Sequence, residues 1–251
     1  PIFHILSILI MPLSGFMMVS GFVDFVYNNQ NWINFFISAT ITLFVGMSVF
    51  LATRGHNDQN IDLRQAFVLT TMSWITIAFF GALPFYLSNI NLGFTDSFFE
   101  SMSGITTTGS TILISIEASP PGILVWRSLL QWLGGIGVIV MAIAIFPMLS
   151  VGGMQLFKAE NFENPEKVVP RATSLTRGIF IIYSVLTLIW ASLLYLSGMS
   201  SFDSILHSMT TIATGGYSTK SGSIGAFNSQ LIDWIIILGM IFGSLPFVHY
   251  L

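Results

Sequence analysis

Long apolar segments alternate with short polar linkers along the whole chain. A helix needs roughly 20 apolar residues to span a bilayer, and six segments reach that length. They lie at residues 2–27, 32–53, 66–90, 123–149, 178–199 and 229–251. This pattern predicts six membrane-spanning helices.

Two further apolar-to-amphipathic segments, 96–106 and 203–213, are too short to span a bilayer. At a rise of 1.5 Å per residue each is about 16 Å long, roughly half of the hydrocarbon thickness. Asp96 and Asp203 stand at their N-terminal ends, where we expect them to act as N-caps. We therefore predict two re-entrant helices, each followed by a loop at membrane depth.

The two short segments belong to a sequence repeat. Residues 96–109 and 203–216 align without a gap, 107 positions apart, with seven of fourteen residues identical. The alignment pairs Gly109 with Gly216 and Glu100 with His207. It predicts a two-helix N-terminal unit followed by two helix–pore-helix–helix repeats, the second incomplete. The expected boundaries are 1–53, 54–150, a linker at 151–177, and 178–251.

Composition supports a membrane protein. The chain is 53% hydrophobic and only 8% charged, whereas a soluble domain has about 25% charged residues. The net charge of −3 gives no reason to expect a nucleic-acid partner, and the absence of cysteine excludes disulfides and thiol catalysis. No carboxylate pair, histidine cluster or nucleophile constellation stands at catalytic spacing, so we expect neither an enzyme nor an organic cofactor. Because the chain begins at Pro1 rather than Met, we expect a fragment.

Basic residues predict the orientation. Six of the eight Lys and Arg residues fall in the linkers 54–65 and 150–177, which the positive-inside rule assigns to the cytoplasm together with the N-terminus. The two loops then open to the outside. The polar linker 151–177 is either a solvated connector or a docking surface for a soluble regulatory subunit.

The two loops carry the chemistry of a cation filter. A bare K⁺ ion must exchange its water shell for oxygens, and backbone carbonyls of an extended loop supply them where glycine permits the necessary φ angles. The C-terminal end of each short helix also favours a cation at the membrane centre. The alternative is a pair of ordinary extracellular turns. The predicted ion-binding residues are Thr107, Thr108, Gly109, Ser110, Thr214, Gly215, Gly216 and Tyr217.

Other polar residues leave alternatives open. Glu100 and His207 could be a vestibule charge and a titrating site, or polar contacts behind the loops. Arg127 is expected to anchor a helix at the interface, or else to tune the entrance potential. Asp24 is expected to be a solvated cap and Trp126 an interface-belt residue.

Four motifs resemble one transporter family: residues 126–149, 152–157, 214–219 and 243–247. Together with the twofold repeat they are similar to the Trk/Ktr/HKT superfamily of K⁺ transporters, above all to the bacterial Trk membrane subunit. The resemblance implies an all-α, K⁺-channel-like protein of the bacterial inner membrane. It also implies a homodimer with cytoplasmic nucleotide-binding regulatory subunits. Glycine at positions 109 and 216 implies a preference for K⁺, whereas some relatives with serine in the first filter conduct Na⁺.

The expected function is therefore potassium uptake, with this chain supplying two of the four filter loops that the family uses. The open alternatives are a non-conducting remnant or assembly partner, and a relative that passes both Na⁺ and K⁺. A transporter of another solute built on inverted repeats is a further alternative, but both repeats are predicted to run in the same direction. Sequence leaves open whether transport is passive or a symport coupled to H⁺ or Na⁺.

Overall fold

The computed structural model describes residues 2–55, 63–149, 168–245 and 247–250. Every regular element among these residues is a helix. Four helical segments are long and apolar enough to cross a membrane: Ile2–Val26, Trp32–Thr53, Arg64–Leu87 and Thr176–Leu196. The expectation of an all-α membrane protein is confirmed.

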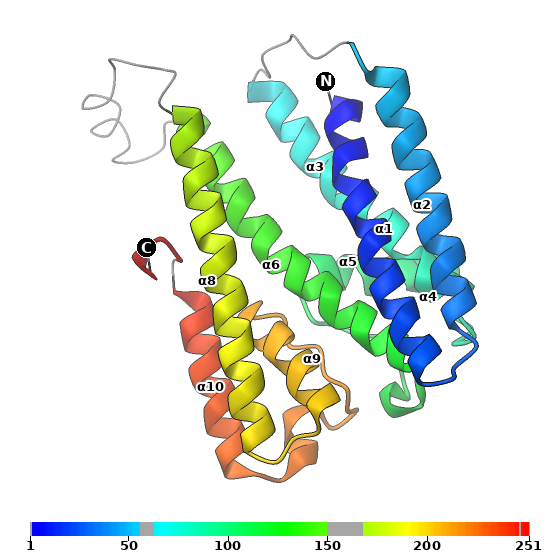
Figure 1. Cartoon of the computed structure of the whole chain (residues 1–251), viewed down its shortest axis with the longest axis vertical. Helices are drawn as coiled ribbons and strands as arrows, with labels where there is room; N and C mark the ends of the chain where they lie inside the picture. Colours follow the sequence, from blue (N-terminus) through cyan, green and yellow to red (C-terminus); the bar gives the residue numbers. More distant parts are fainter. Residues whose placement is uncertain (1, 56–62, 150–167, 246, 251) are drawn as a thin grey trace.

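The N-terminal helices α1 (Ile2–Val26) and α2 (Trp32–Thr53) form an antiparallel hairpin. Helix α1 also packs on α3 (Leu63–Gly81) and on α6 (Pro121–Leu149), so the hairpin is joined to the rest of the bundle mainly through α1 (Figure 1), while α2 contacts the short helix that follows α3. The largest hydrophobic cluster fills this junction. Its fully buried members include Met17, Phe35, Phe85, Ile123, Trp126 and Leu130.

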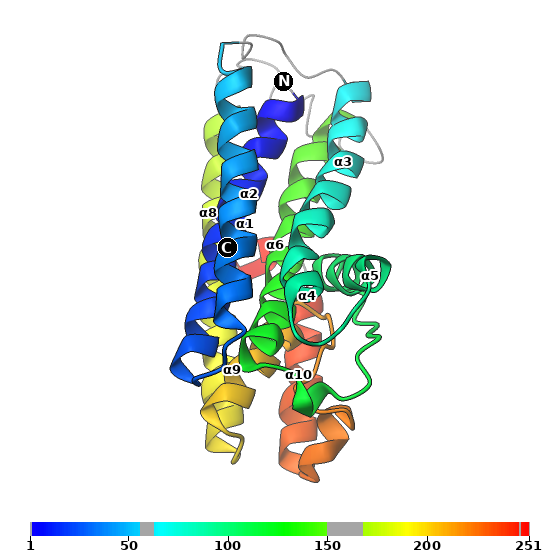
Figure 2. The same cartoon turned by 90° about the vertical axis from the view of Figure 1, so that its right-hand side faces the viewer.

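The first repeat contains α3, the five-residue α4 (Leu83–Leu87), α5 (Phe94–Ile105) and α6. Helix α5 lies across the direction of the long helices (Figure 2). It packs against α3 on one side and α6 on the other. Glycine makes the second contact possible, because a Cβ atom at Gly134 of α6 would overlap the carbonyl oxygen of Ile105.

The second repeat contains α8 (Val168–Leu196), α9 (Ser201–Ile212) and α10 (Gln230–Ser244). Helix α9 packs against both α8 and α10 and also contacts α6. The main contact between the two repeats is therefore that of α6 with α9. Helix α6 follows the first predicted ion-binding loop in the chain, and α9 directly precedes the second.

The described helices differ from the expected segments in two places. The last predicted span, 229–251, is not one helix: α10 ends at Ser244 and a 3₁₀ turn, η4, occupies Phe247–Tyr250. Leu245 is extended, with φ −70° and ψ 143°, because the residue before a proline is disfavoured in the helical region and Pro246 follows it. The predicted linker at 151–177 lies largely outside the described residues, and its C-terminal part is helical from Val168 onward.

The expected N-caps are also corrected. Helix α5 is capped by Gly93 without a side-chain hydrogen bond, and Asp96 lies inside its first turn. Helix α9 is capped by Ser200, whose hydroxyl accepts the N–H of Asp203 at 3.0 Å. Each aspartate thus lies in the first turn, where a negative charge is favourable without being the cap.

Candidate functional site: two repeated Thr/Gly loops

Helices α5 and α9 each end in a loop of the same backbone shape. We call residues 106–115 loop 1 and residues 213–222 loop 2. Thr107 and Thr214 have φ angles of 55° and 53°, and Gly109 and Gly216 have φ angles of 81° and 83°. Residues that the sequence repeat pairs therefore also have matching backbone conformations.

Equivalent hydrogen bonds tie each loop to its helix. The N–H of Thr108 donates to Ser103 at 3.0 Å, and the N–H of Gly215, at the equivalent position, donates to Thr210 at 2.8 Å. The residue between the two left-handed positions has a negative φ in both loops. The two loops therefore share the same alternation of φ signs over these three residues.

The eight predicted site residues differ in exposure. Thr108, Ser110, Thr214 and Gly216 are exposed, Thr107 and Gly109 are partly buried, and Gly215 and Tyr217 are buried. The loops touch each other: a Cβ atom at Gly109 would overlap the carbonyl oxygen of Gly215, and the hydroxyl of Tyr217 lies 3.3 Å from the carbonyl oxygen of Ser110. The structure thus brings loops 1 and 2 together although they are 107 positions apart in the chain.

Glu100 lies behind loop 1 and is fully buried. Its carboxylate accepts the hydroxyl of Thr111 at 2.8 Å and the backbone N–H of Ile112 at 3.1 Å. Of the two interpretations left open by the sequence, the structure favours a polar contact behind the loop over a vestibule charge.

His207 holds loop 2 from the equivalent position. Its Nδ1 lies 2.8 Å from the carbonyl oxygen of Asp203, and its Nε2 lies 3.0 Å from the hydroxyl of Ser218. A carbonyl only accepts, so Nδ1 carries the proton, and Nε2 of the neutral ring accepts from Ser218. Loop 2 is therefore fastened to α9 as loop 1 is fastened to α5.

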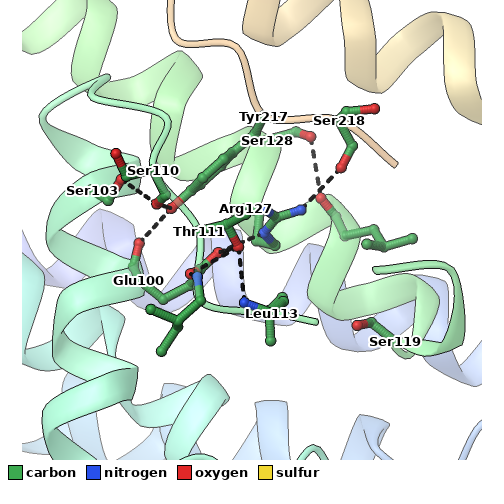
Figure 3. A network of polar contacts seen from close by, with 12 residues as sticks. Glu100, Ser103, Ser110, Thr111, Leu113, Ser119, Arg127, Ser128, Tyr217 and Ser218 are labelled. Atoms are coloured by element: carbon green, nitrogen blue, oxygen red, sulfur yellow. Dashed lines mark hydrogen bonds and ion pairs between the residues drawn. The ribbon is translucent and has the colours of Figure 1, made fainter. Parts of the chain in front are cut away.

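Arg127 is not the interfacial anchor that its position at a helix end suggested. It is 1% exposed, and its Nε donates to Glu100 at 2.8 Å while its Nη1 donates to the carbonyl of Ser218 at 3.0 Å. The guanidinium carbon also lies 4.0 Å from the centre of the Tyr217 ring. Figure 3 shows this residue between the elements of the two repeats.

Two other expectations about helix ends are wrong. Asp24 is fully buried rather than solvated, and its carboxylate accepts the N–H of Gly122 at 2.6 Å and the side-chain amide of Asn31 at 2.9 Å. It thereby caps α6 from another helix. Trp126 is also fully buried, and its indole N–H donates to the carbonyl of Gly81 at 2.9 Å.

The site offers oxygen ligands from the backbone. Within the described ranges, no group of three or more His, Cys, Asp or Glu residues is placed to hold a metal ion. The exposed positions of the loops carry carbonyl groups and threonine or serine hydroxyls. Backbone carbonyls are the groups from which the filters of cation channels are built.

The chain resembles known transporters over most of its length. Residues 31–251 match the family model of TrkH, described as a cation transport protein. The Trk system potassium uptake protein TrkI of Halomonas elongata is 42% identical over 252 residues, covering 100% of this chain and 51% of that protein. The Trk system potassium uptake protein TrkH of Escherichia coli K12 is 39% identical over 239 residues, covering 94% of this chain and 49% of that protein.

A solved structure shows the same fold. The crystal structure of the potassium transporter TrkH from Vibrio parahaemolyticus superposes with a TM-score of 0.83 at 35% sequence identity. The match covers 95% of this chain and 48% of that chain, so the present chain spans about half the length of the relatives it matches. With a family model matched over residues 31–251 and relatives at these identities, the chain belongs to the TrkH family of cation transport proteins.

Proposed function

We propose that this chain supplies part of a pathway for potassium uptake, and that loops 1 and 2 bind the ion. The observation that carries the proposal is the repeated backbone of the two loops, with left-handed Thr107 and Thr214 each followed two residues later by a left-handed glycine. The ligands would be carbonyl and hydroxyl oxygens of residues 107–110 and 214–217. Helices α5 and α9 would act as pore helices, with their C-terminal dipoles directed toward the ion.

The preference for K⁺ is part of the proposal. Gly109 and Gly216 both have the positive φ that glycine adopts freely. A larger residue at either position would alter the carbonyl geometry on which the choice between K⁺ and Na⁺ depends. Relatives covering about twice this length carry names of potassium uptake proteins. The two loops of this chain would then form half of a filter.

The assembly follows from the same proposal. The membrane would be the bacterial inner membrane, with the N-terminus on the cytoplasmic side. A homodimer with cytoplasmic nucleotide-binding regulatory subunits would form the working transporter. The domain boundaries at 53, 150 and 177 belong to the proposal, since the segment 150–167 lies outside the described residues.

Ion influx in cells tests the proposal. The gene would be expressed from its native genomic locus with all adjoining coding sequence, in a bacterium lacking other K⁺ uptake. We expect Gly109→Ser and Gly216→Ser to lower the ratio of Rb⁺ to Na⁺ influx. Gly198→Ser is the matched control, because Gly198 has a φ of 103° but lies outside both loops. If both loop variants keep the original ratio, the loops do not select the ion.

A second candidate is a chain that supports assembly without conducting. It predicts no Rb⁺ influx from the native locus even when the protein is abundant in the membrane.

A further inference from the structure

Four buried side chains connect the two loops across the boundary between the repeats. They are Glu100 of α5, Arg127 and Gln131 of α6, and Tyr217 of loop 2. Their exposed fractions are 0%, 1%, 0% and 3%. We call this set the cross-repeat clamp, and most of it is visible in Figure 3.

Helix α6 holds loop 2 at two neighbouring residues. The side-chain oxygen of Gln131 accepts the backbone N–H of Tyr217 at 3.0 Å. Four residues earlier on the same face, Arg127 donates to the backbone carbonyl of Ser218 at 3.0 Å. Gln131 also packs so closely on Gly215 that a Cβ atom there would overlap the amide. The first repeat therefore sets the position of the second loop.

The contact is reciprocal. The hydroxyl of Tyr217 lies 2.8 Å from the carbonyl oxygen of Glu100 and 3.3 Å from that of Ser110, and it donates to them. The same Glu100 that binds Arg127 also holds Thr111 and Ile112 of loop 1. A shift of Arg127 would therefore change the positions of both loops.

The second repeat has no equivalent device among its described residues. His207 binds Asp203 and Ser218, both of its own repeat. Helix α10 contains no lysine or arginine over Gln230–Ser244. The buried cross-repeat contacts of the loop 2 backbone therefore come from α6 of the first repeat, and the exposed Glu117 adds a contact to Ser221 near the end of loop 2.

Stabilisation of the fold is a weak explanation for the buried ion pair between Glu100 and Arg127. Two charges buried in a membrane protein carry a desolvation penalty that their attraction does little more than offset, and an apolar pair of similar volume is often as stable. What the ion pair provides is geometry, because the planar guanidinium fixes a carboxylate, a carbonyl and a ring face at the same time.

We propose that the cross-repeat clamp is a set of positioning residues that makes ion selectivity a joint property of loops 1 and 2. This rests on the proposed function of the loops as a K⁺ filter. The clamp acts through its side chains, none of which is a proposed ion ligand; of its members only Tyr217 would also face the ion, through its backbone carbonyl. It fixes the distance and tilt between the loops, so neither loop can relax toward a smaller ion on its own.

Charge removal separates positioning from simple support. Glu100→Gln with Arg127→Gln removes both charges together, which avoids leaving a single buried charge unpaired. We expect the double variant to reach the membrane in normal amount, with its Rb⁺/Na⁺ influx ratio lowered at least about threefold. Arg127→Lys keeps the positive charge but loses the planar guanidinium with its several donors. We expect this variant also to lower the Rb⁺/Na⁺ influx ratio.

The matched control is Glu117→Gln. Glu117 also joins the two repeats, by accepting the N–H of Ser221 at 2.7 Å, but it is exposed and lies outside the clamp. We expect this variant to keep the original ratio of Rb⁺ to Na⁺ influx.

The outcomes are distinguishable when Gly216→Ser is measured beside these variants in protein expressed with all adjoining coding sequence. A lowered ratio in Gly216→Ser with an unchanged ratio in the double variant overturns the clamp and leaves the filter standing. An unchanged ratio in Gly109→Ser and Gly216→Ser removes the filter itself, and the clamp with it. If the double variant does not accumulate, Tyr217→Phe decides. That change removes one hydroxyl, and an unchanged ratio overturns the clamp.

Discussion

Glu100 and His207 make the same contact in the two repeats: each side chain hydrogen-bonds the hydroxyl that stands 11 residues further along the chain. Thr111 and Ser218 are those partners, and they are themselves 107 positions apart. The carboxylate of one repeat and the imidazole of the other thus fasten their loops by equivalent hydrogen bonds. The geometry of the contact is the same in both repeats although the side chains differ. Only the carboxylate of Glu100 also pairs with Arg127, the residue that connects the loops.

The two loop glycines should differ in their tolerance of a side chain. Gly216 has open space around its Cβ position, so Gly216→Ala meets only the left-handed strain of about 1–2 kcal/mol. Gly109→Ala carries the same strain and also pushes against the carbonyl of Gly215. We expect thermal unfolding of the detergent-solubilised protein to show a larger loss for Gly109→Ala. Equal losses would mean that the loops are not in contact there.

Asp24 should contribute to stability far more than an ordinary helix-end acid. Asp24→Ala leaves the buried N–H of Gly122 and the amide of Asn31 without their acceptor, at a cost of about 1–3 kcal/mol. Asp233→Ala is the control, because Asp233 is an exposed acid in the first turn of α10, where its removal costs less than about 1 kcal/mol. Melting temperatures of the two variants test the difference, and equal shifts would show that Asp24 does not cap α6.

The two short helices should respond in opposite directions to changes at their caps. Ser200→Ala removes the cap of α9 and should cost about 1 kcal/mol. Gly93 has φ −64° and ψ 164°, close to the −60° and 154° of Ser200, and a Cβ there meets nothing nearer than 3.6 Å. Gly93→Ser should therefore stabilise α5 by a few tenths of a kcal/mol. A melting temperature lowered by Gly93→Ser would contradict the equivalence of the caps.

Glu117 should make its contact with Ser221 of loop 2 sensitive to acid. Hydrogen bonds from the hydroxyl and the N–H of Ser221 lower the pKa of the Glu117 carboxyl below its ordinary value of 4.5. A lowered pKa in the folded state means that the stabilisation is complete above the ordinary pKa and is lost as the pH falls through the lowered one.

The test is the difference in melting temperature between the original protein and Glu117→Gln. We expect the original protein to be the more stable one at about pH 7, and the difference to shrink as the pH is lowered below the ordinary pKa of 4.5 and the carboxyl takes up its proton. A difference that stays constant over this range would show that the charge of Glu117 is not involved.

Sequence was sufficient for the all-helical class, the repeat and the location of the loops, although not for the end of the last helix or for the N-caps. Apolar segments near bilayer length leave few structures other than helices, and an ungapped repeat predicts equal backbone. Gly109 and Gly216, at φ 81° and 83°, are the clearest result of that reasoning.

Sequence was not sufficient for the polar residues at helix ends. Asp24, Trp126 and Arg127 have the composition and position of interfacial residues, and all three are buried. Their burial depends on neighbours from other elements: Gly122 for Asp24, Gly81 for Trp126 and Glu100 for Arg127. Pairing Glu100 with Arg127 was the one contact that charge alone could have indicated, since a buried charge in a membrane needs a partner.

The central claim is that loops 1 and 2 bind K⁺ through their own oxygens, and anomalous scattering from Rb⁺ tests it most directly. Crystals of the protein expressed with all adjoining coding sequence, grown in Rb⁺ and in Na⁺, would be compared. We predict Rb⁺ peaks in contact with carbonyl oxygens of residues 107–110 and 214–217, and no such peaks in Na⁺. Protein that takes up Rb⁺ in cells but shows no Rb⁺ peak at either loop would contradict the account.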